Sequence, residues 1–351
     1  MWSFLSSFLI ALLFTPLVIR FYRRNNWLDD PEKNSHVKKT HSKAVPRGGG
    51  IVIFIATFLA ATLILDFDKY LLAIFLGATL LTIVGLIDDV FDINPYLRLI
   101  SGLVASLIVV GAGIGIAYIS NPFGPGVIHL DQPQFSFNFL GEVHSIWILS
   151  SLFAVFFIMW NMNIINWAKG VDGQLPGFVS VSCIFIAILA NRFADAPTQF
   201  NVANLALIVA GAFAGLLVWN FYPQKIMPGY GAGSLAGYFL SVLAILSGAK
   251  VATMLMVLAI PTADGIFTIV RRLIAGKSPF WGDRGHLHHK LMDYYGWGRR
   301  RIAIFYIATS AALGFLSLYL DTTGKIITIL ATSLIVFSFL VYSKIKAKQN
   351  E

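Results

Sequence analysis

Cysteine is almost absent from this chain, because Cys183 is the only one among 351 residues. A single cysteine excludes an intrachain disulfide, and its place in an apolar run favours a small packing residue. Charge is also scarce: Asp, Glu, Lys and Arg make up 12% of the residues, whereas soluble domains carry about 25%. This shortage excludes an ordinary water-soluble globular protein.

Hydrophobic residues are abundant instead, at 57% of the chain, and they form long uncharged runs. Tyr70–Ile87, Leu99–Ile119 and Val251–Ala263 contain no charged side chain, and about 20 apolar residues cross a bilayer as a helix. We expect spans near 2–20, 49–65, 70–87, 99–119, 146–165, 177–191, 203–220, 234–247, 251–270, 303–320 and 326–343. The sequence therefore predicts an all-α integral membrane protein, a polytopic bundle of about eleven transmembrane helices in one domain over residues 1–351.

The basic residues predict the orientation of these spans. No basic residue precedes the first run, whereas Arg20, Arg23 and Arg24 follow it, which predicts an N-terminus outside and a cytoplasmic C-terminus. All of the 26 basic residues then lie on the inside except Lys69, Arg192, Lys250 and Lys325. We expect a multi-pass protein of the plasma (inner) membrane, whose net charge of +9 indicates contact with anionic membrane lipid and no nucleic-acid partner.

The longest outside connection, about residues 120–145, has a strand-like pattern. Apolar residues alternate over Gln134–Phe139, and Asn-Pro and Gly-Pro pairs precede them. We expect a small surface hairpin there, with no chemical role.

Unusual polar clusters gather on the predicted cytoplasmic side. They lie in five connections, near residues 21–48, 88–98, 161–176, 221–233 and 271–302. Because these connections meet at one face of the bundle, they can build a single site at the membrane surface. We therefore expect an active site that faces the cytoplasm.

The densest acidic cluster is Asp88-Asp89-Val90-Phe91-Asp92. Asp88 and Asp92 share a helix face, with Asp89 alongside, if the helix continues through them. Adjacent carboxylates repel each other unless a cation neutralises them, and hard oxygen ligands suit Mg²⁺. The alternative is an acidic, solvated helix end, which the helix macrodipole disfavours. The pattern therefore favours metal–diphosphate chemistry.

Two further inside segments carry groups that suit a phosphate or a nucleotide. In Arg47-Gly48-Gly49-Gly50 the glycines permit close backbone approach, and Arg47 can donate to a phosphate. Asn163 and Asn166 lie one turn apart ahead of Asp172, and amides and a carboxylate can contact a base, ribose or sugar. Turn formation and capping of a span end are the structural alternatives.

A histidine cluster follows the ninth predicted span. His286, His288 and His289 lie within four positions, beside Asp283 and Arg284. No cysteine is near, and the spacing is not that of a helical zinc pair. The cluster therefore favours anion binding or orientation of a substrate. A basic loop that faces lipid headgroups is the alternative.

Asp264 lies inside the ninth predicted span, three residues after Pro261. A carboxylate within a membrane span is a candidate functional residue by default, since an unpaired charge there is costly. An ion pair with Arg271 or Arg272 is the structural alternative.

Taken together, these motifs resemble those of the polyprenyl-phosphate N-acetylhexosamine-1-phosphate transferases of the glycosyltransferase family 4 type. The matching strings are Asp30-Pro31, Lys38-Lys39-Thr40-His41, Pro46-Arg47-Gly48-Gly49-Gly50, Asp88-Asp89, Asn163-Ile164-Ile165-Asn166, Gly170-Val171-Asp172-Gly173, Pro261 with Asp264, and Asp283-Arg284-Gly285-His286-Leu287-His288-His289. They occur in the family's order. The histidine string is more similar to the branch that uses UDP-N-acetylglucosamine and undecaprenyl phosphate.

The resemblance implies that N-acetylglucosamine-1-phosphate passes from a UDP-sugar to undecaprenyl phosphate, with release of UMP, as the first membrane step of cell-envelope polysaccharide synthesis. It implies Mg²⁺, with Mn²⁺ as an alternative, held by Asp89, Asp88 and Asp172, and it makes Asp88 and Asp89 the catalytic pair. The implied substrate-binding residues are Lys39, His41, Arg47, Asn163, Asn166, Asp172, Asp264, Asp283, Arg284, His286, His288 and His289. A homodimer is left open.

Two positions depart from the family's pattern. Lys169 stands where the first aspartate of the asparagine-rich motif is usual, and Gly231 stands where the loop after the seventh span usually supplies an aspartate. A carboxylate is lost at each position, and a cation is gained at one of them. We expect weaker or reorganised metal binding.

Three other functions are compatible with parts of the sequence. Transfer of phospho-N-acetylmuramoyl-pentapeptide belongs to a branch with a differently arranged histidine triplet. An intramembrane prenyltransferase needs a second acidic motif, and none is found. A non-enzymatic lipid-phosphate transporter is expected to show broken helices or repeated halves around a midplane site, whereas the polar groups here gather at one surface.

Overall fold

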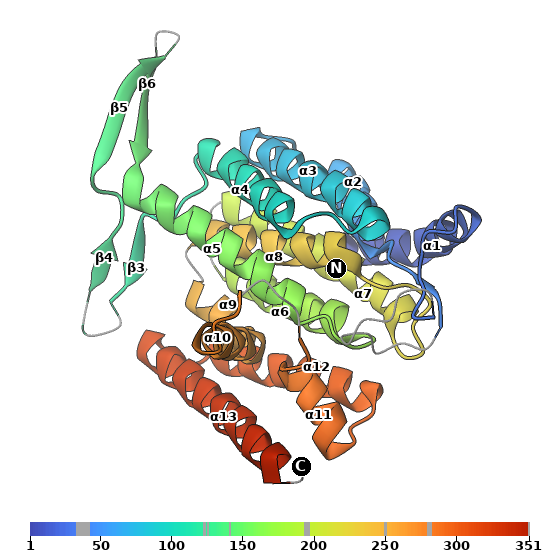
Figure 1. Cartoon of the computed structure of the whole chain (residues 1–351). Coiled ribbons are helices and arrows are strands. Elements are labelled where there is room, and N and C mark those ends of the chain that lie inside the picture. Colours follow the sequence, from blue (N-terminus) through green and yellow to red (C-terminus); the bar gives the residue numbers. More distant parts are fainter. Residues whose placement is uncertain are drawn as a thin grey trace.

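The computed structural model describes the chain except residues 33–42, 122–123, 125, 140–141, 193–196, 249–250, 279–282 and 350–351. Its described part is a helical bundle with three two-stranded antiparallel ribbons (Figure 1). The helices are α1 (Trp2–Arg24), α2 (Gly49–Ile64), α3 (Lys69–Phe91), α4 (Pro95–Gly111), α5 (Ile148–Trp167), α6 (Gln174–Asn191), α7 (Pro197–Asn220), α8 (Gly229–Leu246), α9 (Val251–Val257), α10 (Ala259–Ile274), α11 (Leu287–Tyr295), α12 (Arg299–Ser317) and α13 (Thr322–Gln349). The strands are β1 (Leu28–Asp29), β2 (Val45–Pro46), β3 (Tyr118–Ser120), β4 (Val127–His129), β5 (Gln134–Phe139) and β6 (Glu142–Trp147).

Helix α8 forms the centre of the bundle because many of its side chains are small. Its residues from Gly231 to Ile245 are all buried, and the helix packs against α2, α3, α5, α6 and α7. A Cβ atom on Gly237 would lie 2.4 Å from the Cα atom of Met162 on α5. Such small residues allow helix backbones to touch within a membrane.

A second close approach joins the ends of α2, α3 and α8. A Cβ atom on Gly85 of α3 would lie 2.5 Å from Gly231 Cα, and one on Gly50 of α2 would lie 2.9 Å from the same atom. Three glycines on three helices therefore meet at one point. This contact places the end of α3, with Asp88 and Asp89, beside the start of α8.

Helices occur at all the predicted spans, but fewer of them qualify as membrane spans by length and composition. In the described residues seven are long and apolar enough, or eight if the bent pair α9 and α10 counts as one. α2 and α4 have only 16 and 17 residues, about 25 Å of helix against a hydrocarbon core of about 30 Å. α12 begins with three arginines. The structure thus supports a multi-pass, all-α membrane protein, and eleven spans stay a prediction.

The ninth predicted span is broken into α9 and α10, which meet at 79°. Pro261 lies in the first turn of α10, where a missing N–H removes no intrahelical hydrogen bond. A broken span is also expected of a transporter, but the described part of the chain contains one such bent pair and no second. The break places Asp264 in a buried position one turn after the proline.

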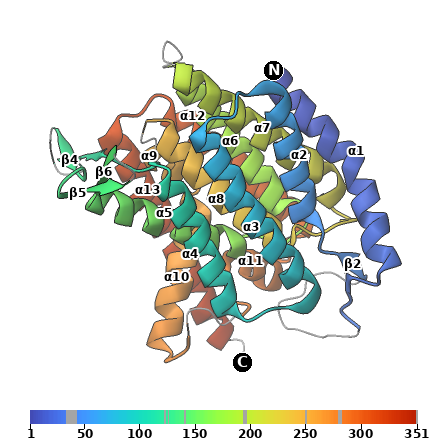
Figure 2. The same cartoon turned by 90° about the horizontal axis from the view of Figure 1, so that it is seen from above.

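The predicted surface hairpin is confirmed. β5 pairs with β6 in register from Gln134 with Trp147 to Phe139 with Glu142, and the hairpin extends away from the helices (Figure 1). A shorter ribbon, β3 with β4, precedes it. In the second view β2, α11 and the C-terminus lie toward one end of the bundle, and the N-terminus lies toward the other (Figure 2).

Candidate active site

Asp88 is buried at the end of α3 and forms an ion pair with Arg98. Arg98 donates from Nε to Asp88 Oδ1 at 2.5 Å and from Nη2 to Asp92 Oδ1 at 2.6 Å. The helix does not continue through the cluster, since it ends at Phe91 and Asp92 adopts a left-handed conformation. Asp88 and Asp92 therefore share one arginine across a turn, and Asp89 faces α8 instead.

Asp89 is held by the first backbone N–H groups of α8. Tyr230 N donates to Asp89 Oδ1 at 2.7 Å, and Gly231 N donates to Oδ2 at 3.5 Å. The N-terminus of a helix has unpaired N–H groups and a positive dipole end, which favour an anion. Gly229 just before them has φ +69°, and a Cβ atom there would lie 2.2 Å from Asp89 Oδ2. Only glycine allows both this backbone conformation and the close approach of the carboxylate.

The connection between α1 and α2 contacts the loop that precedes α8. Gly49 N donates to Met227 O at 3.1 Å, and Met227 N donates to Pro46 O at 2.8 Å. Between these contacts Arg47 donates from Nε to Asp29 Oδ2 at 2.9 Å, and its charge also acts on Asp89. Arg47 is thus placed near Asp89 but is paired within the protein. The predicted residues Lys39 and His41 lie outside the described residues.

Lys169 lies in the same cluster. Its Nζ atom donates to the carbonyl of Gly229 at 2.7 Å and lies 5.8 Å from the centre of the Tyr230 ring, whose other cation is Arg98 at 5.3 Å. Burial lowers the pKa of Lys169 to about 8, while the charges of Asp89 and Asp88 act in the opposite direction. The two carboxylates therefore favour the charged form of the lysine.

The asparagine motif reaches α8 through one of its two amides. Asn166 Nδ2 donates to Ser234 Oγ at 3.1 Å, and a Cβ atom on Gly233 would lie 2.4 Å from Asn166 Oδ1. Asn163 donates instead to Met159 O in its own helix at 2.8 Å. Asn166 therefore joins the α5–α8 contact, and Asn163 does not.

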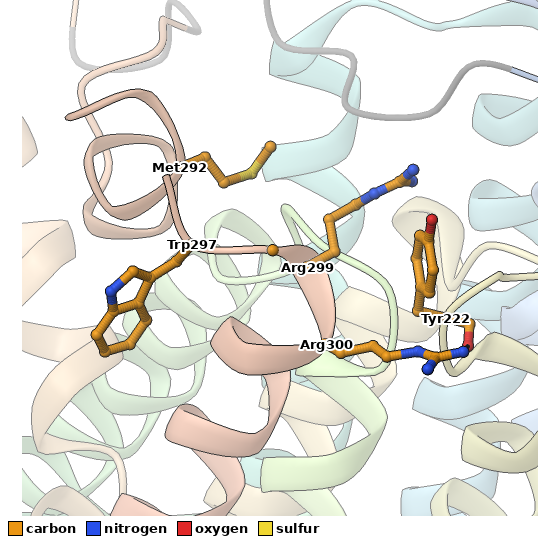
Figure 3. A pocket seen from close by; sticks show the side chains of 6 residues that line it. Tyr222, Met292, Trp297, Arg299 and Arg300 are labelled. Atoms are coloured by element: carbon orange, nitrogen blue, oxygen red, sulfur yellow. Dashed lines mark hydrogen bonds between the residues drawn. The ribbon is translucent and has the colours of Figure 1, made fainter. Parts of the chain in front are cut away.

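Asp172 is buried and lies among a different set of partners. Its Oδ2 atom accepts from Gln224 N at 3.2 Å, and its Oδ1 atom pairs with Arg299 Nη1 at 3.3 Å. Arg299 borders a cavity of about 340 Å³, in which it and Arg300 extend toward the Tyr222 ring (Figure 3). The other lining residues are Met292, Trp297 and Gly298. Cationic and aromatic groups together suit an anionic, planar ligand.

Asp264 organises the histidine cluster from α10. Its Oδ1 atom accepts from Leu287 N, the first N–H of α11, at 2.8 Å, and its Oδ2 atom lies 3.0 Å from His286 Nδ1. The alternative of an ion pair with Arg271 or Arg272 is wrong. Both arginines pair with Asp283 instead, and Arg284 pairs with Asp293. The sequence did not predict the bend between α9 and α10. Asp264 lies in α10, shortly after this bend.

The His288 ring stacks on that of His286 and lies tilted against that of His289, and it reaches the loop that follows Asn166. The ring centres of His286 and His288 are 5.6 Å apart, and those of His288 and His289 are 4.3 Å apart. A Cβ atom on Gly170 would lie 1.9 Å from His288 Nε2. Gly170 thus leaves room for His288, and the loop with Lys169 and Asp172 meets the histidine segment there.

The buried histidines predict a loss of stability in acid. Burial lowers the pKa of His289 to about 4 and that of His288 well below its ordinary value, and the positive charge of Arg284 adds to both effects. Both rings are neutral at pH 7. Unfolded histidines titrate near 6.5, so between that pH and about 4 the unfolded chain binds more protons, and stability falls as pH falls.

We therefore expect the unfolding temperature of the solubilised protein to fall between pH 7 and pH 5, and His289→Gln to make this slope shallower. The unfolding temperature at each pH is measured from thermal unfolding curves that are monitored by intrinsic fluorescence. His129→Gln removes a histidine from the exposed strand β4 and should keep the wild-type slope. An unchanged slope in His289→Gln would contradict the assignment.

The implied divalent cation fits these residues poorly. Asp88 is committed to Arg98, Asp89 to two backbone N–H groups, and Asp172 to Arg299. In the part of the chain that the structure describes, no group of three or more His, Cys, Asp or Glu side chains is arranged to hold a metal ion. Lys169 and Gly231 occupy the places where the family's pattern would add carboxylates.

Several residues of the cluster were not predicted from the sequence. Arg98 is one of the basic residues on the predicted inside and follows the acidic cluster after a short turn, and that proximity is a usable signal. Tyr230 contacts Asp89, and Arg299 contacts Asp172, and in both pairs the partners are more than 120 residues apart in the sequence. Thr268, which lies 3.4 Å from His286 Nδ1, carries no sequence signal of its own.

Comparison with known proteins agrees with the motifs. The family model described as glycosyl transferase family 4 matches residues 71–248. A probable undecaprenyl-phosphate N-acetylglucosaminyl 1-phosphate transferase of Bacillus subtilis is 26% identical over 99% of this chain and 90% of its own length. A decaprenyl-phosphate N-acetylglucosaminephosphotransferase of Mycobacterium leprae is 26% identical over 79% of this chain and 72% of its own.

A relative from the other branch matches as well. A phospho-N-acetylmuramoyl-pentapeptide-transferase of Bacillus licheniformis is 26% identical over 92% of this chain and 97% of its own length. The family model covers half of the chain, and these relatives cover most of it. The chain therefore belongs to glycosyl transferase family 4 and is a multi-pass membrane phosphotransferase.

Proposed function

We propose that this chain transfers N-acetylglucosamine-1-phosphate from a UDP-sugar to an undecaprenyl-type lipid phosphate and releases UMP. The observation that carries the proposal is the meeting of five connections at one end of the bundle, where Asp89, the start of α8 and Lys169 are in contact. The relative from B. subtilis, which aligns with 99% of this chain, supports the donor and the acceptor.

In this reaction an oxygen of the acceptor phosphate attacks the sugar-bound phosphorus of the donor. The new P–O bond forms as the bond to the bridging oxygen breaks, and UMP leaves with that oxygen. A phosphate monoester has its second pKa near 6, so the acceptor is largely dianionic at neutral pH and needs no strong base. The demand on the protein is to hold several negative charges close together.

The cations around Asp88 and Asp89 meet that demand. Arg98, Arg47 and Lys169 come from three different connections, and the side chains of Arg98 and Arg47 keep 27% and 30% of their surface exposed. An anionic substrate can therefore reach these two arginines from the protein surface. The carboxylates keep these cations apart and in place, so that phosphates bind between them.

The nucleotide is assigned to the side where Asp172 pairs with Arg299. The cavity there is lined by Tyr222 and Trp297 together with Arg299 and Arg300, which suits a base and a phosphate. The histidine cluster adjoins the same loop at Gly170. We assign it to the sugar-phosphate, because the neutral rings of His288 and His289 can donate and accept hydrogen bonds.

The site is proposed to face the cytoplasm at the plasma membrane. Basic residues concentrate in the connections that form it, which agrees with the positive-inside tendency. Cytoplasmic nucleotide-sugars would then reach the site directly. The acceptor's prenyl chain would lie in the surrounding lipid.

A second candidate donor is UDP-N-acetylmuramoyl-pentapeptide. It is favoured by one observation, the 26% identity over 92% of this chain with a phospho-N-acetylmuramoyl-pentapeptide-transferase. The reaction at phosphorus is the same, and only the sugar substituent differs. The two donors are therefore separated by experiment and not by mechanism.

Incubation of the purified protein with undecaprenyl phosphate and a panel of UDP-sugars tests the proposal. We expect UMP release and a lipid-linked N-acetylglucosamine diphosphate, detected by mass spectrometry, with UDP-N-acetylglucosamine. Boiled protein and reactions without lipid phosphate are the controls. A lipid-linked muramoyl-pentapeptide product would favour the second donor, and no lipid product with any donor would contradict both.

A further inference from the structure

Lys169 occupies a central position in the acidic cluster. Its ammonium group donates to the Gly229 carbonyl at 2.7 Å, and the Asp89 carboxylate packs against Gly229 so closely that a Cβ atom would lie 2.2 Å from Oδ2. The charge of Lys169 is attracted by both Asp89 and Asp88. The lysine is thus the cation that faces the two adjacent carboxylates from the side of the asparagine loop.

Each of the two adjacent carboxylates already has a positively charged partner. Asp88 pairs with Arg98 at 2.5 Å, and Asp89 has the N-terminus of α8 on one side and the attraction of Lys169 on the other. A divalent cation placed between these carboxylates would meet the positive charges of Lys169, Arg98 and Arg47. In a partly buried site solvent screens such repulsion much less than it does at the protein surface.

Gly231 provides no carboxylate that could offset these positive charges. It lies where α2, α3 and α8 meet, and a Cβ atom there would come within 3.3 Å of Gly50 Cα and 3.5 Å of Gly85 Cα. A larger residue at this point would push the helices apart. Relative to the family's pattern, Gly231 and Lys169 each remove one carboxylate that could bind a metal. Lys169 also adds a positive charge, so the two departures act together.

We propose that Lys169 is a built-in replacement for the divalent cation, and that the Asp88–Asp89 cluster of this chain binds no divalent metal. In the proposed transfer reaction, on which this part rests, the ammonium group of Lys169 provides positive charge to the donor's diphosphate. Unlike a metal ion, it remains attached to the chain and its position is set by the Gly229 carbonyl. The reaction is then insensitive to removal of divalent cations.

Binding of Mn²⁺ to the purified, detergent-solubilised protein tests this inference without any substrate. Electron paramagnetic resonance counts free and bound Mn²⁺ in the wild type, Lys169→Asp, and Lys169→Asp combined with Asp89→Asn. We expect no Mn²⁺ bound to the wild-type cluster. Lys169→Asp should bind a single Mn²⁺ with an affinity at least about tenfold above the wild-type detection limit, and the double variant should lose this binding. Size-exclusion chromatography verifies that each variant is folded.

Lys69→Asp is the matched control. It makes the same change of charge at the exposed start of α3, about 30 Å along the helix from Asp89, and it should bind no more Mn²⁺ than the wild type. If the wild type binds Mn²⁺ and Asp89→Asn abolishes that binding, the inference is overturned. If neither the wild type nor folded Lys169→Asp binds Mn²⁺, Lys169 is not what displaces the metal, and the inference is overturned as well.

Because these measurements use no donor or acceptor, they remain informative if the proposed transfer is wrong. Should the chain prove active, its rate in EDTA provides a second readout. We expect the rate to change less than about twofold, well under 1 kcal/mol of barrier.

Discussion

Asp89→Asn is expected to lower the rate of sugar-phosphate transfer by at least about 100-fold, which corresponds to ~2.7 kcal/mol of activation free energy. The amide keeps the size of the side chain but loses its negative charge. Lys169 and Arg47, which act electrostatically on Asp89, then lack their counter-charge. The N–H groups of Tyr230 and Gly231 also lose their anionic acceptor. Release of UMP in the presence of undecaprenyl phosphate measures the effect.

The appropriate control is Asp66→Asn. Asp66 is exposed in the connection between α2 and α3, so the same change should leave UMP release close to the wild-type rate. The loss in Asp89→Asn should occur mainly in kcat if the cations hold the phosphates in the transition state. Wild-type UMP release by a folded Asp89→Asn protein would refute the assignment of the site.

Gly237→Leu is expected to prevent accumulation of the folded protein. Even a Cβ atom at this position would lie 2.4 Å from the Cα atom of Met162 and 2.5 Å from its N atom. Inserting a few carbon atoms into a packed interior costs about 1–3 kcal/mol when side chains can adjust. Backbone atoms of α5 cannot move aside without displacing the whole helix, so we expect a cost at or above the upper end of that range.

The yield of monodisperse protein and its unfolding temperature measure this effect, and Gly111→Leu is the matched control. Gly111 is exposed at the end of α4, and nothing lies within 4 Å of a Cβ atom there. A leucine in a helix also avoids the entropic penalty of glycine, about 0.5–1 kcal/mol. Similar yields of the two variants would show that the α5–α8 contact is not close-packed.

The location of the long helices could be predicted from the sequence because each of them forms within an apolar run, whereas the short α11 does not and was not predicted. The run decides that a helix forms, but its length decides whether the helix crosses a membrane. α2 and α4 are too short by this measure, and α12 begins among arginines. The break between α9 and α10 was missed, because Val251–Ala263 is apolar on both sides of it.

The candidate site could be predicted as a set of segments but not as a set of contacts. Asp88 and Asp89 are neighbours in the sequence, yet one pairs with Arg98 and the other with α8. Their separation follows from the end of α3 and from the glycine contact with Gly231. Likewise, Asp264 meets His286 across 22 residues. Such pairs depend on how helices pack, which no local pattern encodes.

The single, fully buried cysteine makes the chain a natural background for thiol labelling. Cys183 is 0% exposed in α6, so bulky maleimides and nitroxide reagents would not reach it in the folded protein. A cysteine introduced at an exposed site, such as Ser136 on β5 or Lys43 before β2, would then be the reactive thiol. Labels at two such sites can report distances across the bundle, or the side of the membrane from which each is reached, without removal of a native residue.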